Sequence, residues 1–148
     1  MAALHALYLA NTSAALKRVY TYGQPRTGNA AFASAFDARL RARNIVHYRV
    51  TTYRDPVPHL PMHDMFFEGW VHSGHEVYYN ATRRGAFRTC DTPNTDKCAD
   101  QWNWVQTLTH SCDHCSYLGM NPCTCGDTKP ECEEPRSKGD ETSVTTHR

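Results

Sequence analysis

The sequence predicts an α/β fold with a mostly parallel sheet and flanking helices. Residues 18–23 (RVYTYG) and 45–53 (IVHYRVTTY) are rich in β-branched and aromatic residues, as strands are. Residues 30–43, which lie between them, repeat large apolar side chains every four positions from Phe32 to Leu40, as one face of a helix does. A strand, a helix and a strand in about 35 residues form a βαβ unit, so the two strands should run parallel with a right-handed crossover.

Length, charge and hydropathy limit the class of protein. The 148 residues suit one domain. The net charge of +1, from 16 basic and 15 acidic residues, argues against a nucleic-acid partner, because such proteins usually carry a basic stripe. No apolar run approaches the roughly 18 residues of a membrane span, so no transmembrane segment is predicted.

The first ten residues, MAALHALYLA, are apolar and small. A signal peptide needs a basic region before its apolar core, and no Lys or Arg precedes Lys17. We therefore interpret this stretch as the end of a buried helix, and expect no signal peptide in this chain. A helix that opens without a cap indicates a chain with something missing upstream. Further on, Asn29 follows the loop QPRTG and is a candidate N-cap for the next helix.

Less regular segments follow the second strand. Residues 69–80 and 86–90 have strand composition and predict a hairpin or two edge strands, and residues 102–119 are predicted to be partly helical. Residues 126–148 carry ten charged residues and almost no apolar ones, which predicts a disordered tail. The predicted folded unit is therefore residues 1–125.

All seven cysteines come after residue 89, at a density that suits an oxidising compartment. The odd count means that at least one thiol is free or has its partner outside this chain. A zinc site is an alternative for Cys112, Cys115, Cys123 and Cys125, but their spacing is tighter than that of a zinc ribbon. Disulfides are therefore favoured and no metal is predicted.

Asp55, in TTYRDPVPHLP, is the first candidate for chemistry. It follows a predicted strand at the edge where parallel sheets place their sites, and prolines stiffen the loop around it. It is either an ordinary turn residue or the acid that orients a catalytic histidine. Among nine histidines, His72 and His75 have a strand-like setting that favours structural roles, whereas His114 lies on a predicted loop. No serine stands in a G-x-S-x-G elbow, so the residues indicate an acid and a base without a nucleophile.

Four segments in this order resemble the fungal class 3 lipases, which include triacylglycerol lipases and related feruloyl esterases. The segments are VYTYGQPRTGNAAFASAF, YRVTTYRDPVPHLP, HSGHEVYY and DHCSYLG. The resemblance extends from residue 1 to about residue 125. It implies the C-terminal half of an α/β-hydrolase fold.

The resemblance also implies roles for particular residues. Asp55 matches the catalytic acid and His114 the catalytic base of the family. Cys90 and Cys98 match a small disulfide loop, and Cys123 or Cys125 matches a cysteine that pairs near the N-terminus of the family fold. A final set matches the lining of the acyl pocket: Val57, Leu60 and Pro61.

The nucleophile of the family lies in a GHSLGG-like elbow, for which this sequence has no counterpart. The opening helix resembles the segment that follows that elbow. We therefore expect a fragment of a secreted ester hydrolase that carries the acid and base without the serine, and is inactive alone. The resemblance implies no cofactor, and a lipid or ester substrate at an interface in the intact enzyme. Alternatives are a feruloyl or other cell-wall esterase, a non-catalytic lipase-like binding protein, or a small zinc module.

Overall fold

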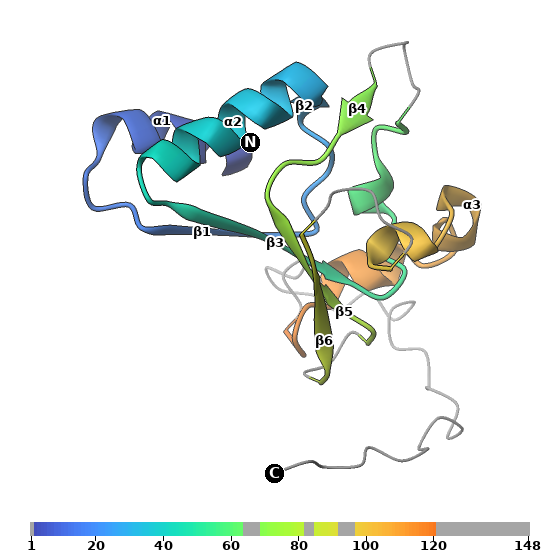
Figure 1. Ribbon diagram of the computed structural model, residues 1–148. Coiled ribbons are helices and arrows are strands. Elements are labelled where there is room, and N and C mark those ends of the chain that lie inside the picture. The colour runs from blue at the N-terminus through green and yellow to red at the C-terminus, as the bar shows by residue number, and fades with distance from the viewer. Residues whose placement is uncertain (1, 64–68, 82–84, 92–96, 121–148) are drawn as a thin grey trace.

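In the computed structural model, four strands form one sheet in the order β1-β3-β5-β6 (Figure 1). The structure describes residues 2–63, 69–81, 85–91 and 97–120. The strands are β1 (Arg18–Tyr22), β3 (Val46–Thr52), β5 (His75–Tyr79) and β6 (Phe87–Cys90). β1, β3 and β5 run parallel, and β6 is antiparallel to β5. The mostly parallel sheet and the β1–α2–β3 unit are therefore as predicted.

Two helices, α1 (Ala2–Thr12) and α2 (Ala30–Ala42), lie together on one side of the sheet (Figure 1). The side chain of Asn29 accepts a hydrogen bond from the Phe32 amide and caps α2 as expected. The core between these elements consists of Ala3, Ala6, Ala10, Phe36, Leu40 and Ile45. Burying a side chain such as Leu40 stabilises the fold by about 1.5–3 kcal/mol.

The first ten residues were predicted to be the end of a buried helix, and α1 does form there, but only one face of it is buried. α1 buries the alanines on one face, whereas Leu4 and Tyr8 are 48% and 62% exposed. The two exposed residues are four apart and share a stripe of the helix. Apolar composition alone does not reveal that the alanines and the partly buried Leu7 pack against the core while Leu4 and Tyr8 do not.

Shorter elements complete the described fold. β2 (Gly28–Asn29) pairs with β4 (Trp70–Val71). The short helices are η1 (Val57–His59), η3 (Ala99–Gln101), α3 (Trp104–Thr107) and η4 (Ser111–Cys115). The last two agree with the partly helical prediction for residues 102–119, and the tail predicted at 126–148 lies outside the described residues. No described helix is long and apolar enough to span a membrane.

The two edges of the sheet differ. Next to β6, the Cys90–Cys98 disulfide closes a loop and Arg88 donates to the Lys97 carbonyl. At the other edge, no strand of the described ranges pairs with the outer side of β1, where Tyr20 and Tyr22 are about half exposed. An edge strand of this kind leaves backbone groups available for pairing.

A charged pair lies inside the sheet, between β3 and β5. Arg49 is fully buried and its Nη2 lies 3.3 Å from Oε2 of Glu76, which is itself 3% exposed. Oε1 of Glu76 accepts hydrogen bonds from the Thr51 hydroxyl and the Ala99 amide. Arg49 Nε also donates to the Ser73 carbonyl, at 2.9 Å. Glu76 thus ties both strands to η3.

Candidate active site

The loop that carries Asp55 begins with a forced turn. Tyr53 directly follows β3 and has a φ of 38°, a left-handed value that a bulky side chain rarely adopts. Its amide donates to the Tyr79 carbonyl, and its own carbonyl accepts a bond from the Tyr78 hydroxyl. These bonds hold the turn, which directs the chain away from β3 toward Asp55. The Asp55 amide then donates to the Thr52 carbonyl.

Asp55 and His114, which are 59 positions apart in the sequence, are in direct contact. Nδ1 of His114 lies 3.1 and 3.0 Å from the two carboxylate oxygens of Asp55, so the protonated nitrogen donates to the carboxylate. Asp55 is 2% exposed, while the His114 side chain is 36% exposed. His114 lies in η4 rather than on the predicted open loop. Because Nδ1 faces the acid, Nε2 is the ring nitrogen that could exchange a proton with a reactant.

Two further groups hydrogen-bond to the carboxylate of Asp55. The Val57 amide donates to Oδ1 at 2.8 Å, and the hydroxyl of Tyr117 donates to Oδ2. Tyr117 is 2% exposed, and burial, with the charge of Asp55 adding to it, raises its pKa well above the usual range. The hydroxyl therefore keeps its proton and acts as a donor. In the sequence, Tyr117 is only one residue of the segment DHCSYLG, which does not indicate this bond.

Gly23, at the carboxyl end of β1, packs its backbone against the acid–base pair. Its φ is +56°, and a Cβ built there would lie 2.8 Å from Oδ2 of Asp55 and 2.8 Å from the His114 ring. Both the conformation and the space therefore require glycine. From the sequence, Gly23 was predicted only as the last residue of the strand at 18–23.

The contact with Asp55 sets a testable pH dependence. The hydrogen bond to Asp55 raises the pKa of His114 above its ordinary 6.5, although partial burial opposes the shift. Because the folded pKa is higher than the unfolded one, the charged pair stabilises the fold fully below pH 6.5. That stabilisation is lost as the pH rises through the folded pKa of His114.

We therefore expect NMR titration of the His114 ring protons to give a pKa above 6.5, and Asp55→Asn to bring that pKa down. Denaturant unfolding of the parent chain and of Asp55→Asn from pH 5 to 9 serves as an independent readout. The difference between their free energies of unfolding should be largest at pH 5. A His114 pKa at or below the ordinary value would contradict the contact.

The other predicted residues take different positions. Val57 and Pro61 are partly buried and Leu60 is 44% exposed, so their assignment to an acyl pocket stays a prediction. A cavity of about 510 Å³ near the acid loop has a different lining, namely Arg26, His59, Met62, His63, Asp100, Trp102, Asn103 and Trp104.

The other histidines and the cysteines also have definite surroundings. His72 is buried and donates through Nε2 to the Pro58 carbonyl, at 2.8 Å. His75 is half exposed and lies 3.2 Å from Asp91. Cys112 and Cys115 are disulfide-bonded, so they do not provide the thiolates that the zinc alternative needs. Within the described ranges, no group of three or more His, Cys, Asp or Glu could hold a metal ion. Cys123, Cys125 and Cys132 lie outside those ranges.

The chain is similar to known lipases in sequence. A family model described as "Lipase (class 3)" matches residues 1–65. A lipase from Rhizomucor miehei is 32% identical over 108 residues, which is 72% of this chain. The chain belongs to the class 3 lipase family.

Solved lipase structures extend the match to most of this class 3 lipase chain. Lipase II from Rhizopus niveus has a TM-score of 0.64 at 27% identity, and the match covers 80% of this chain and 43% of that one. A triacylglycerol lipase, whose catalytic centre is described as a serine protease triad, has a TM-score of 0.62 at 29% identity over 80% of this chain and 44% of its own. The fold is that of the α/β-hydrolase lipases, as predicted. The chain spans 27% of the Rhizomucor miehei lipase and less than half of each of these two structures.

Proposed function

We propose that this class 3 lipase chain carries the acid and the base of a serine-dependent carboxylic ester hydrolase that acts on triacylglycerols. The observation that supports this most is the contact between buried Asp55 and partly exposed His114 beyond the carboxyl end of β3. A similar solved structure is described as a triacylglycerol lipase with a serine protease triad. An acid, a base and a serine in that arrangement perform acyl transfer.

In the proposed reaction, Asp55 holds His114 with its proton on Nδ1 and stabilises the imidazolium that forms. Nε2 of His114 takes the proton from a serine hydroxyl as the serine oxygen attacks the ester carbonyl. The tetrahedral intermediate collapses to an acyl-enzyme, and His114 gives the proton to the departing alcohol. Water then attacks the acyl group with His114 again as base, which releases the fatty acid and regenerates the serine.

The serine itself is not assigned within this sequence. None of the seven serines stands in a G-x-S-x-G elbow, the motif that exposes such a nucleophile. The proposal therefore places the nucleophile and the oxyanion donors in polypeptide outside these 148 residues. It follows that the chain alone should not hydrolyse esters.

A chimera tests the proposal. The matching part of the Rhizomucor miehei lipase is replaced by this chain, and hydrolysis of tributyrin is measured beside the isolated chain on a nitrophenyl ester. We expect turnover by the chimera only, and His114→Ala should lower kcat/KM by about 10⁴- to 10⁶-fold. His75→Ala, at a half-exposed histidine paired with Asp91, is the matched control and should change little.

Two outcomes would contradict parts of the proposal. Turnover by the isolated chain that disappears with His114→Ala would mean that these residues contain their own nucleophile. Chimera activity that survives His114→Ala would remove His114 as the base. Comparing tributyrin, trioctanoin and methyl ferulate in the same assay would separate the lipase proposal from a feruloyl or other cell-wall esterase.

The absence of a G-x-S-x-G motif also favours a second candidate, a lipase-like protein that binds lipid without hydrolysing it. In that case the isolated chain should float with a triolein emulsion, and His114→Ala should float equally well. The disulfides at Cys90, Cys98, Cys112 and Cys115 support an oxidising and hence extracellular location under either candidate.

A further inference from the structure

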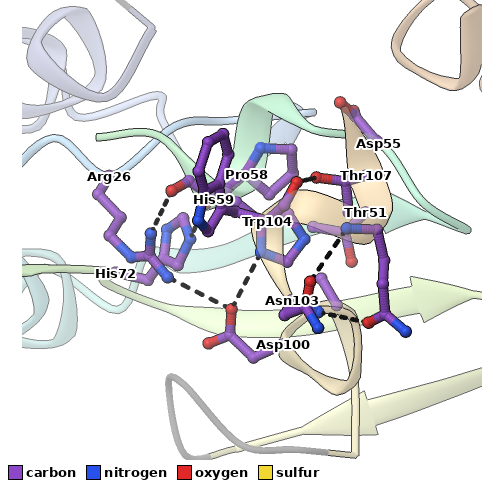
Figure 2. Close-up of polar contacts among 12 residues, drawn as sticks. Arg26, Thr51, Asp55, Pro58, His59, His72, Asp100, Asn103, Trp104 and Thr107 are labelled. Atoms are coloured by element: carbon purple, nitrogen blue, oxygen red, sulfur yellow. Dashed lines mark hydrogen bonds and ion pairs between the residues drawn. The ribbon is translucent and has the colours of Figure 1, made fainter. Parts of the chain in front are cut away.

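We propose that Arg26 is a positioning residue for the Asp55–His114 pair, and that it acts through the backbone of the loop that carries Asp55. The significance for catalysis rests on the function proposed above, whereas the positioning itself is a statement about geometry. Arg26 does not touch the pair. It lies in the connection between β1 and α2, and its side chain reaches the far end of the loop, residues 55–61 (Figure 2).

The proline-rich loop has fewer backbone N–H donors than carbonyl acceptors. Pro56, Pro58 and Pro61 have no backbone N–H, but they and their neighbours keep their carbonyls. Within the loop, the amides of His59 and Leu60 donate to the carbonyls of Pro56 and Val57, and the Val57 amide donates to the carboxylate of Asp55. The four carbonyls from residue 58 to residue 61 therefore depend on other parts of the chain, because a buried carbonyl without a partner is costly.

Arg26 satisfies three of these four carbonyls. Its backbone amide donates to Leu60 at 2.7 Å, and its Nη1 donates to His59 at 2.6 Å and to Pro61 at 3.0 Å. The fourth carbonyl, that of Pro58, accepts from Nε2 of His72. Burial lowers the pKa of His72 well below its usual value, which keeps this imidazole neutral. One residue thus fixes the backbone of three consecutive loop positions.

Asp100 forms an ion pair with the guanidinium of Arg26, at the nitrogen that does not contact the loop carbonyls. Its Oδ1 lies 3.3 Å from Nη2 of Arg26 and 3.6 Å from Nδ1 of His59 (Figure 2). Asp100 belongs to η3, which begins directly after Cys98 of the disulfide, and the preceding Ala99 amide is bonded to Glu76. Because Asp100 is anchored to the sheet in this way, it holds Arg26 in one orientation. Arg26 itself is only 8% exposed.

The connection that contains Arg26 also touches the acid–base pair. Gly23, three residues before Arg26, packs against both Asp55 and His114. His114 lies on η4, none of whose residues is buried. Its contacts with Asp55 and Gly23, which belong to other parts of the chain, therefore help to fix its ring. If the loop shifts, Asp55 moves relative to His114 and Gly23. A change at Arg26 should therefore be detected at His114, through the hydrogen bond that raises the His114 pKa.

The test is an NMR titration of the His114 ring in the full chain, which needs no ester hydrolysis. We expect Arg26→Gln to lower the His114 pKa toward its ordinary 6.5, because the bond from Nδ1 to Asp55 is weakened. Removal of a positive charge alone would raise the pKa of a nearby histidine, so the sign separates lost positioning from lost charge. Arg26→Lys keeps the charge but not the planar fork, and should shift the pKa in the same downward direction.

Controls separate positioning from general destabilisation. Leu40→Val weakens the core on α2 away from the loop, and should lower Tm without moving the His114 pKa. Asp55→Asn, in the same titration, measures the largest fall that loss of the acid can produce. Asp100→Asn changes a partly exposed side chain, so it should leave the chain folded and give a smaller fall than Arg26→Gln.

An unchanged His114 pKa in a folded Arg26→Gln chain would overturn the proposal, even if Tm falls. If Arg26→Gln does not fold, Arg26→Lys and Asp100→Asn take its place in the titration. A His114 pKa that is unchanged in both of these variants would overturn the proposal. A fall with Arg26→Lys supports it. The positioning proposal is tested by the His114 pKa and the ester hydrolase proposal by turnover. Either proposal can therefore fail without the other.

Discussion

Asp55→Asn is expected to lower kcat/KM of the active chimera by about 10⁴-fold while the protein stays folded. The amide nitrogen of asparagine can donate to Nδ1 of His114, which favours the tautomer whose proton is on Nε2. That tautomer has no free Nε2 to accept the serine proton. Tributyrin hydrolysis measures the loss, and ¹⁵N shifts of the imidazole report which nitrogen carries the proton.

The chain offers a matched control for this substitution. Asp91 also faces a histidine, with Oδ1 3.2 Å from Nδ1 of His75, but both side chains are at least half exposed. Asp91→Asn should leave kcat/KM unchanged. Full activity in Asp55→Asn would exclude Asp55 as the acid that orients the base.

Glu76→Gln should lower the free energy of unfolding by about 3–5 kcal/mol. The substitution leaves the Arg49 charge without its partner in a fully buried position, and it weakens the acceptor that Thr51 and Ala99 share. Urea unfolding at pH 7 measures the change. Burial lowers the pKa of Arg49, and the charge of Glu76 opposes that shift, so Glu76→Gln removes an interaction that favours the buried cation.

Two comparisons test the assigned cause. The double variant Arg49→Met with Glu76→Leu removes both charges, and it should be considerably more stable than Glu76→Gln alone. Arg39→Gln removes a bond between exposed Arg39 and Asn11, and should cost no more than about 0.5 kcal/mol. A Glu76→Gln chain as stable as the parent would mean that the buried pair is not needed for stability.

The parts of the fold that follow from local pattern were predictable. The strands at 18–23 and 45–53 and the helix at 30–43 lie within about one residue of β1, β3 and α2, because composition and apolar spacing are local properties. The partners of buried polar residues were not predictable. A glutamate such as Glu76, in the strand segment HEVYY, would be expected to face solvent. It instead pairs with Arg49 on the neighbouring parallel strand. Nothing in either segment indicates that the other will lie beside it.

The same division applies to the candidate site. Composition and spacing left Asp55 open between a turn residue and an acid, and the resemblance to a family selected it together with His114. The groups around the pair were missed. Tyr117 and Gly23 lay within quoted motifs, but their roles come from contacts over 62 and 32 positions of sequence. A long charged residue in a loop, such as Arg26, usually faces solvent, whereas this one is buried against the carbonyls of His59 and Pro61, more than 30 residues away.

The dependence of the loop carbonyls on Arg26 limits how this region can be exchanged between related enzymes. A donor loop grafted in place of residues 55–61 would arrive with its own pattern of prolines and carbonyls, and the resident arginine would suit it only if the spacing were the same. We therefore regard residues 23–29 and 55–61 as a single cassette for recombination. Library designs that place a crossover between them should yield mostly misassembled sites, whereas designs that move both together should retain the geometry.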